Sequence, residues 1–205
     1  MCSSDLRECE NIRFVTQVGD IVNDHQKDLE QWKVASASMA ILDDAVPYGV
    51  AIGNHDFDGV GGKQAATEFV KNFGPQRYAG RPWYGGASEN GLNSYQLFSG
   101  GGVDFVIFHM EIDMPDDAIA WATDVLKKYP HRAAIVSTHS YLKGRDGIGR
   151  NAKPAYNNHG NSAEAVWDKW IRREPQIFIV LCGHEGRTDE RSEERRVGKE
   201  CRSRW

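Results

Sequence analysis

Apolar residues recur along the chain with two different periods, which together predict strands that alternate with helices. Short apolar or alternating runs bounded by turn residues predict strands at residues 11–18, 47–52, 93–98, 103–110, 132–138 and 176–182. Apolar residues at helical spacing predict helices at residues 28–43, 63–73, 116–129 and 162–173. This alternation is typical of α/β proteins.

Two long segments between these elements are expected to be loops. They cover residues 74–92, rich in glycine, proline and aromatic residues, and residues 139–161. Loops of about 20 residues are uncommon in small domains and often carry binding or catalytic residues. We therefore expect functional side chains in or next to them.

Composition narrows the class of protein. The chain has 205 residues, of which 40% are hydrophobic, and this is enough for one domain with its own core. No run approaches the roughly 18 apolar residues of a membrane span, so none is predicted. The formal net charge of −4 argues against a nucleic-acid platform that works through a general basic field. Four cysteines do not suggest a disulfide framework.

The two ends of the chain differ from the rest. Residues 191–205 are mostly charged, with Val197 as their one aliphatic residue. Read back into codons, this segment and residues 1–6 resemble the two adapters of a sequencing library. We therefore expect residues 1–6 and 191–205 to be non-native, and residues 7–190 to be a partial domain truncated at both ends.

Side chains that can bind metal ions follow four of the predicted strands. They lie in Gly19-Asp20 with Asp24, in Gly53-Asn54-His55-Asp56, in Thr138-His139 and in Gly183-His184. The carboxyl edge of an open α/β sheet is where ligands bind, and a preceding glycine allows the backbone to turn sharply there. Each motif alone is a weak signal, but the four together predict a metal site. His109 also ends a predicted strand, where a structural role is the stronger interpretation.

With these motifs the sequence resembles the calcineurin-like metallophosphoesterase family over nearly all of residues 11–187. GDxxD, GNHD, a lone His and GH stand in the family's order. The resemblance implies a four-layer α/β/β/α sandwich with a two-metal centre at the strand ends. It further implies hydrolysis of a phosphomonoester or phosphodiester by a metal-bridging hydroxide, with a small phosphate ester as the partner molecule.

The resemblance also implies which residues hold the two divalent metal ions. Asp20 would bridge the two ions, because the two oxygens of a carboxylate can bind one ion each. Asn54, His139 and His184 would complete the second metal site. Oxygen and imidazole ligands without a thiolate suit Mn, Fe or Zn.

Other motif residues would act around the metal ions. By the same resemblance, His55 would protonate the leaving alkoxide or stabilise charge, and Asp56 would orient its ring. Asp24 resembles a residue that does not touch the metal ions but orients their ligands by hydrogen bonding. His159, in the second long loop, is a candidate for substrate contact, and Glu185 is a candidate oxygen ligand.

Two elements of the family's pattern are absent from this sequence. A D-x-H motif should precede GDIVND, but residues 7–17 contain none. The family closes with G-H-x-H, whereas Gly186 stands at the position of the second histidine. We therefore expect the first metal site to be incomplete, so that this piece of the protein can be inactive as it stands.

Two alternatives to an enzyme remain open. The first is a degenerate member of the family that binds a metal ion or a phosphorylated ligand without turnover. The second is a non-catalytic adhesion or structural module of secreted bacterial proteins. No protein partner is implied. Similarity to secreted bacterial phosphoesterases favours a location outside the cytoplasm.

Overall fold

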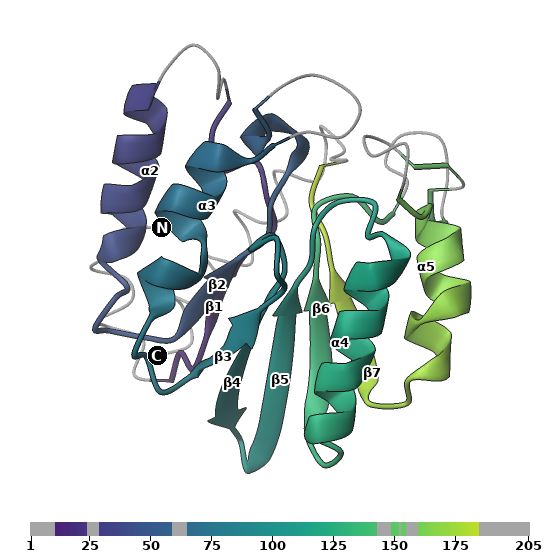
Figure 1. Cartoon of the computed structure of the whole chain (residues 1–205). Helices are drawn as coiled ribbons and strands as arrows, with labels where there is room; N and C mark the ends of the chain where they lie inside the picture. The colour runs from purple at the N-terminus through teal and green to yellow at the C-terminus, as the bar shows by residue number, and fades with distance from the viewer. Residues whose placement is uncertain are drawn as a thin grey trace, which may run out of the picture.

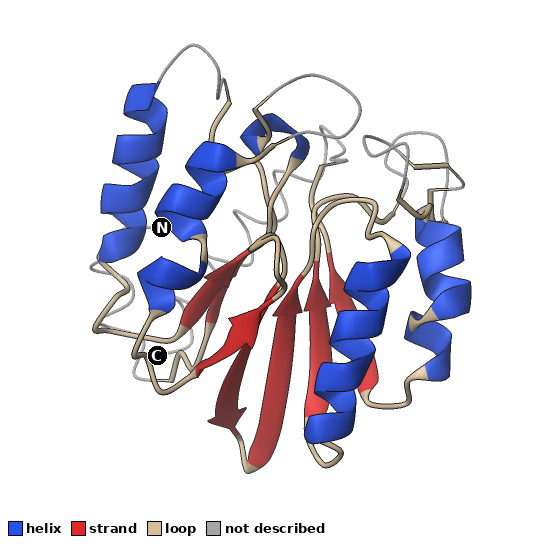
Figure 2. Cartoon of the chain, viewed as in Figure 1, coloured by secondary structure: helices blue, strands red, loops and turns tan. Residues whose placement is uncertain are grey.

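Two β-sheets and four α-helices make up the described part of the chain (Figures 1 and 2). A computed structural model describes residues 11–23, 29–58, 65–142, 149–151, 153–154 and 160–184. The smaller sheet pairs β1 (Val15–Gln17) with β2 (Tyr48–Val50) in parallel. The larger sheet has the order β3-β4-β5-β6-β7.

The larger sheet is mixed. Its strands are β3 (Tyr84–Ala87), β4 (Ser94–Gly100), β5 (Val103–His109), β6 (Ala133–Ser137) and β7 (Ile177–Leu181). The pairs β3–β4 and β4–β5 are antiparallel, whereas β5–β6 and β6–β7 are parallel. The chain therefore ends β5, β6 and β7 at one edge of the sheet, the upper edge in Figure 1.

One face of the larger sheet is covered by α4 (Asp116–Lys128) and α5 (Ala163–Lys169). Acidic residues lie in the first turn of α4 and lysines in its last, the arrangement that the helix dipole favours. Ser162 caps the start of α5, and its Oγ accepts a hydrogen bond from the backbone N–H of Ala165. The buried apolar side chains of this layer form one core that includes Phe108, Leu126, Val136 and Trp170.

The smaller sheet is covered by α2 (Leu29–Ala40) and α3 (Thr67–Phe73). A second core gathers here around Trp32, Tyr48, Phe69 and Phe73. Arg77, in the short 3-10 helix Pro75–Tyr78, stacks over the ring of Phe73 at 5.0 Å. Each helical layer thus has its own apolar core.

The two sheets pack face to face. Thr16 in β1 reaches across to His109 in β5 and Ser137 in β6, and the rings of Phe14 and Phe98 stack at 4.8 Å. The order of layers is therefore helix, sheet, sheet, helix, and the predicted α/β class is confirmed.

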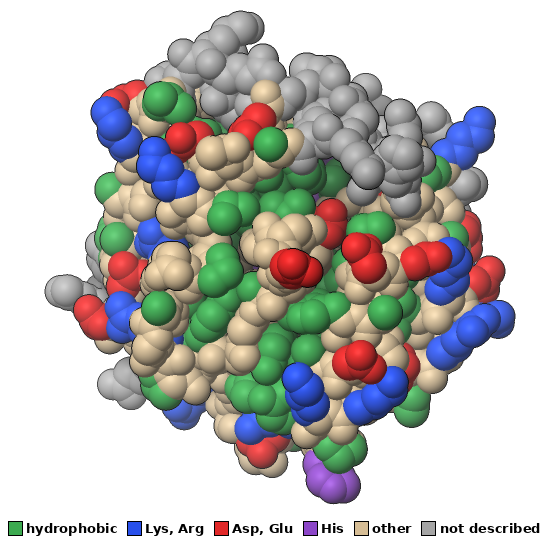
Figure 3. Space-filling model, in the orientation of Figure 1, with side chains coloured by type: hydrophobic (Ala, Val, Ile, Leu, Met, Phe, Trp, Pro, Cys, Tyr) green, Lys and Arg blue, Asp and Glu red, His purple; other side chains and the backbone are tan. Residues whose placement is uncertain are grey.

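The predicted helices and strands are all present with shifted ends, and one strand, β3, was not predicted. Residues 74–92 were expected to be a loop but contain β3 and a 3-10 helix. The predicted helix at residues 162–173 is α5 followed by the 3-10 helix Ile171–Arg173. No helix in the described ranges is long and apolar enough to cross a membrane. On the face shown in Figure 3, acidic and basic side chains are interspersed.

Candidate metal centre

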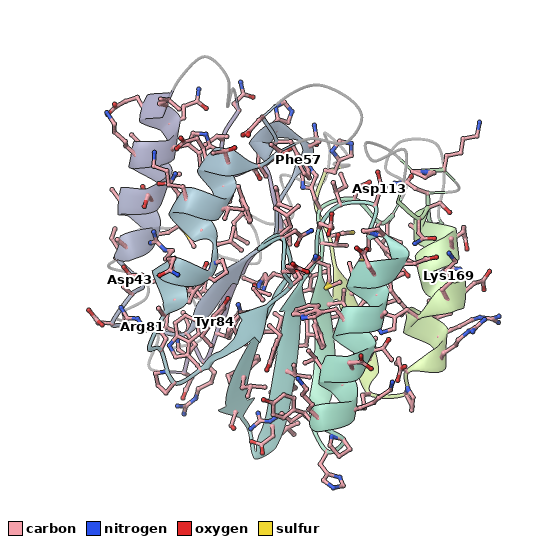
Figure 4. All side chains as sticks on the ribbon, in the orientation of Figure 1. Asp43, Phe57, Arg81, Tyr84, Asp113 and Lys169 are labelled. Atoms are coloured by element: carbon pink, nitrogen blue, oxygen red, sulfur yellow. The ribbon has the colours of Figure 1, made fainter. Side chains whose placement is uncertain are left out.

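The candidate ligands follow strands of both sheets. Asp20 lies three residues after β1, and Asn54 begins a 3-10 helix (Asn54–Asp56) that follows β2. His139 and His184 follow β6 and β7. Figure 4 labels Phe57, which follows β2 of the smaller sheet, and Asp113, which follows β5 of the larger sheet. Both lie near the carboxyl ends of the strands, at the top of the view. The site is therefore assembled from four separate parts of the sequence.

His139 lies at the centre of this group and is 2% exposed. Its Nε2 lies 3.0 Å from Oδ1 of Asn54 and 3.1 Å from Nδ1 of His184. Oδ2 of Asp20 lies 3.1 Å from the same nitrogen. Among the described residues, ligand atoms of Asp20, His139 and His184 all fall within 4.8 Å of one another. The structure thus brings the four predicted metal ligands together.

The hydrogen bond at Nδ1 of His139 determines whether Nε2 presents a proton or a lone pair to the other three ligands. Nδ1 lies 2.8 Å from the carbonyl oxygen of Val18, which can only accept, so Nδ1 carries the proton. In the neutral ring, Nε2 then presents a lone pair toward a carboxylate oxygen, an amide oxygen and an imidazole nitrogen. Converging lone pairs of this kind fit a cation, and the donor types suit Mn, Fe or Zn.

Asp20 and His139 shift each other's ionisation. Burial alone would lower the pKa of His139, but the hydrogen bond and charge of Asp20 reverse this and raise it. Burial alone would raise the pKa of Asp20, but His139 and the backbone N–H of His55 lower it overall. Without a cation, each group therefore favours the charged form of the other, a carboxylate beside an imidazolium.

The backbone is strained at two of the ligands. Asp20 has φ of 54° and His184 has φ of 63°, in the left-handed region that few residues other than glycine occupy. Such strain costs about 1–3 kcal/mol and tends to occur at functional sites. The neighbouring Gly53 has ordinary φ, but a Cβ there would lie 2.2 Å from the backbone nitrogen of Asp20. Glycine at position 53 is thus required by the close approach of the two loops.

Asp56 holds together the two loops of the smaller sheet that carry Asp20 and Asn54. Its Oδ1 accepts hydrogen bonds from the backbone N–H groups of Ile21 and Val22, and its Oδ2 accepts one from Gly53. Burial raises the pKa of Asp56 to about 6, although these N–H groups oppose the shift. The side chain is fully buried. Asp56 therefore joins the loop that carries Asp20 to the loop that carries Asn54.

This differs from the role that the family resemblance implied for Asp56. Nδ1 of His55 lies 2.8 Å from the carbonyl oxygen of Asn23, so this backbone group orients the ring. The 3-10 turn explains the difference, because it directs His55 outward to solvent and Asp56 inward to the loops. Backbone carbonyls give no sequence signal, so neither Asn23 nor Val18 could be identified from the sequence.

The hydrogen bonds of the Asp56 carboxylate predict a large loss of stability when this side chain is replaced by alanine. Asp56→Ala leaves three backbone N–H groups near the core without their acceptor, and we expect a loss of about 3 kcal/mol in urea unfolding. Asp56→Asn should cost less, because the amide oxygen can serve one side while its NH₂ group opposes the other donor. Asp124→Ala, on the exposed face of α4, is the control and should change stability little. An unchanged urea midpoint for Asp56→Ala would contradict this role.

A groove of about 730 Å³ opens beside the site. Asp20 and His55 are among its lining residues, and Ile21, Val34 and Met39 contribute apolar lining. No Lys or Arg is among the described residues that line it. There is thus space next to His55 for an organic group.

Three predicted residues lie outside the described part of the chain. They are Asp24, His159 and Glu185. Gly186, which stands at the position of the family's second histidine, also lies outside it. Their proposed roles remain predictions from the sequence.

Comparison with known proteins identifies the class to which this fold and site belong. Residues 4–196 match the calcineurin-like phosphoesterase family, so the chain belongs to that family. The predicted family is therefore confirmed, and it supports a metal-dependent phosphoesterase at the family level.

A relative from Bacillus subtilis (strain 168), named "Uncharacterized protein YvnB", is 37% identical over 175 residues. The match covers 85% of this chain but 12% of YvnB. The chain thus spans about an eighth of the length of this curated relative.

Proposed function

We propose that this site hydrolyses a phosphomonoester or phosphodiester with the help of divalent metal ions. The observation that carries the proposal is the convergence of Asp20, Asn54 and His184 on Nε2 of His139. Membership of the calcineurin-like phosphoesterase family supports it.

The residues present fit a divalent cation. Asp20, Asn54, His139 and His184 would hold it, and the Val18 carbonyl keeps the ring of His139 in the orientation that this requires. When bound, the ion would polarise the phosphate and activate the attacking water. That a second ion shares Asp20 is part of the proposal and rests on the family resemblance.

His55 is the proposed proton donor to the leaving alcohol. Its ring is exposed, and Nδ1–H donates to the Asn23 carbonyl, so the imidazolium form carries at Nε2 the proton that passes to the leaving oxygen and returns to the neutral ring afterwards. The groove beside it has room for the organic part of the ester. Donation to the leaving oxygen avoids a high-energy alkoxide and typically accelerates such steps by about 10²–10⁴-fold.

Metal removal tests the proposed function. We expect the protein treated with a chelator to lose hydrolysis of an aryl phosphate, and Mn²⁺ or Zn²⁺ to restore it. The assay should use this chain and also the longer gene product, with metal binding followed by calorimetry. Binding without turnover in both would favour the non-catalytic alternative. Absence of binding for Mn²⁺, Fe²⁺ and Zn²⁺ would contradict the proposal.

A further inference from the structure

The metal ligands are divided between the two sheets. Asp20 and Asn54 follow strands of the smaller sheet, and His139 and His184 follow strands of the larger one. The ligand atoms of Asp20, Asn54 and His184 all lie within 3.1 Å of Nε2 of His139. Whatever sets the distance between the sheets therefore also sets the size of the site.

A buried polar contact joins the sheets just below these ligands. His109, at the end of β5, is 0% exposed, and its Nε2 lies 2.9 Å from Oγ1 of Thr16 in β1. Its Nδ1 lies 2.7 Å from Oε1 of Gln96 in the neighbouring β4. The Thr16 hydroxyl also contacts Oγ of Ser137 in β6 at 3.2 Å. Both ring nitrogens of His109 are thus paired, and the ring is fixed in place.

The ring of His109 rests directly on the backbone of Gly49. A Cβ at position 49 would lie 2.2 Å from Cε1 and 2.5 Å from Nδ1 of His109, well inside contact distance. Gly49 is the partner of Thr16 in the β1–β2 ladder, so both residues meet the same ring. At this point the sheets are as close as an imidazole and a bare backbone allow.

This contact lies close in sequence to the ligands on both sides. Thr16 is four residues before Asp20, and Ser137 is two residues before His139. Gly49 is five residues before Asn54. A change in sheet spacing here would reach the ligands through short segments, with little loop to absorb it.

We propose that the contact of His109 with Gly49 and Thr16 sets the spacing of the two sheets and thereby brings the metal ligands within reach of one ion. His109, Gly49 and Thr16 are positioning residues, because none of them is a ligand. The inference rests on the proposed metal site. It predicts that a methyl group at position 49 opens the site while the ligands themselves stay intact.

The first test is Gly49→Ala, assayed by titration with Mn²⁺ and by the absorption spectrum of bound Co²⁺. We expect metal affinity to fall by about tenfold or more, the range seen when residues that orient ligands are lost. The Co²⁺ spectrum should also change, because ligands from one sheet move relative to the other. The control is Gly100→Ala, where the nearest atom to a new Cβ is Cγ of the flexible Arg13 side chain at 3.3 Å.

The second test separates spacing from general damage. In Gly49→Ala/His109→Ser the smaller side chain makes room for the methyl group, and Gln96, whose Oε1 would lie 2.8 Å from the new Cβ, loses its His109 partner and can turn away. Affinity should therefore return to within about twofold of His109→Ser alone. A folded Gly49→Ala protein that binds Mn²⁺ as Gly100→Ala does would overturn the proposal. If Gly49→Ala does not fold, the double variant decides. An affinity far below that of His109→Ser would count against the proposal.

Failure of the metal site itself can be recognised separately. If the unmodified chain binds no metal, the proposed function fails, and sheet spacing is then read from the imidazole NMR signals of His139 and His184. These rings lie 4.9 Å apart between centroids. The Asp20 contact of His139 crosses from one sheet to the other, so Gly49→Ala should shift its signals. Unshifted signals would overturn the inference about spacing.

Discussion

His139→Ala is expected to abolish binding of a divalent cation and, with it, all metal-dependent hydrolysis. Nε2 of His139 contacts Asp20, Asn54 and His184 together. Loss of residues that only orient metal ligands costs about 10–100-fold in affinity. Removal of a central ligand should therefore cost at least about 100-fold, measured by calorimetry with Mn²⁺ and Zn²⁺.

A matched control uses another histidine of the same chain. His131 is exposed beyond the carboxyl end of α4, so His131→Ala removes an imidazole of equal size from the surface. We expect its metal affinity and turnover to equal those of the unmodified protein. Asn54→Ala should weaken binding in the same direction as His139→Ala. Turnover retained in both ligand variants would contradict the assigned site.

The fold was largely predictable from the sequence, because its strands are short apolar or alternating runs bounded by turn residues and its helices carry apolar residues at helical spacing. Strand β3 is the exception, since two of its four residues are glycine and give no strand signal. The ring of Tyr95 explains one of them, because a Cβ at Gly85 would lie 1.9 Å from that ring. Packing from a neighbouring strand thus decides a position that local sequence cannot.

The ligand side chains of the site could be predicted from the sequence, but the groups that orient them could not. Aspartate, asparagine and histidine directly after predicted strands indicated the candidate ligands. The groups that orient His55 and His139 are the carbonyls of Asn23 and Val18, and every residue has a carbonyl. Asp56 was predicted to touch a side chain, yet it accepts backbone N–H groups. Contacts to backbone depend on loop path, which the motif alone does not specify.

His55→Ala should leave metal binding intact and slow the chemical step. His55 contributes a backbone N–H to Oδ1 of Asp20, and Ala keeps that donor. The lost imidazole would remove proton donation to the leaving oxygen, so kcat for an alkyl phosphate should fall by about 10²–10⁴-fold. The measurement is steady-state kinetics in the protein that shows metal-dependent turnover, with Mn²⁺ affinity determined in parallel.

The leaving group distinguishes a proton donor from a residue that only shapes the site. Nitrophenolate leaves readily without a proton, so 4-nitrophenyl phosphate should lose far less rate in His55→Ala than an alkyl phosphate does. A role in shaping the site would slow both esters by the same factor. An equal loss across the series would therefore remove His55 as the acid, and the Asn23 contact would then count only as support for the loop.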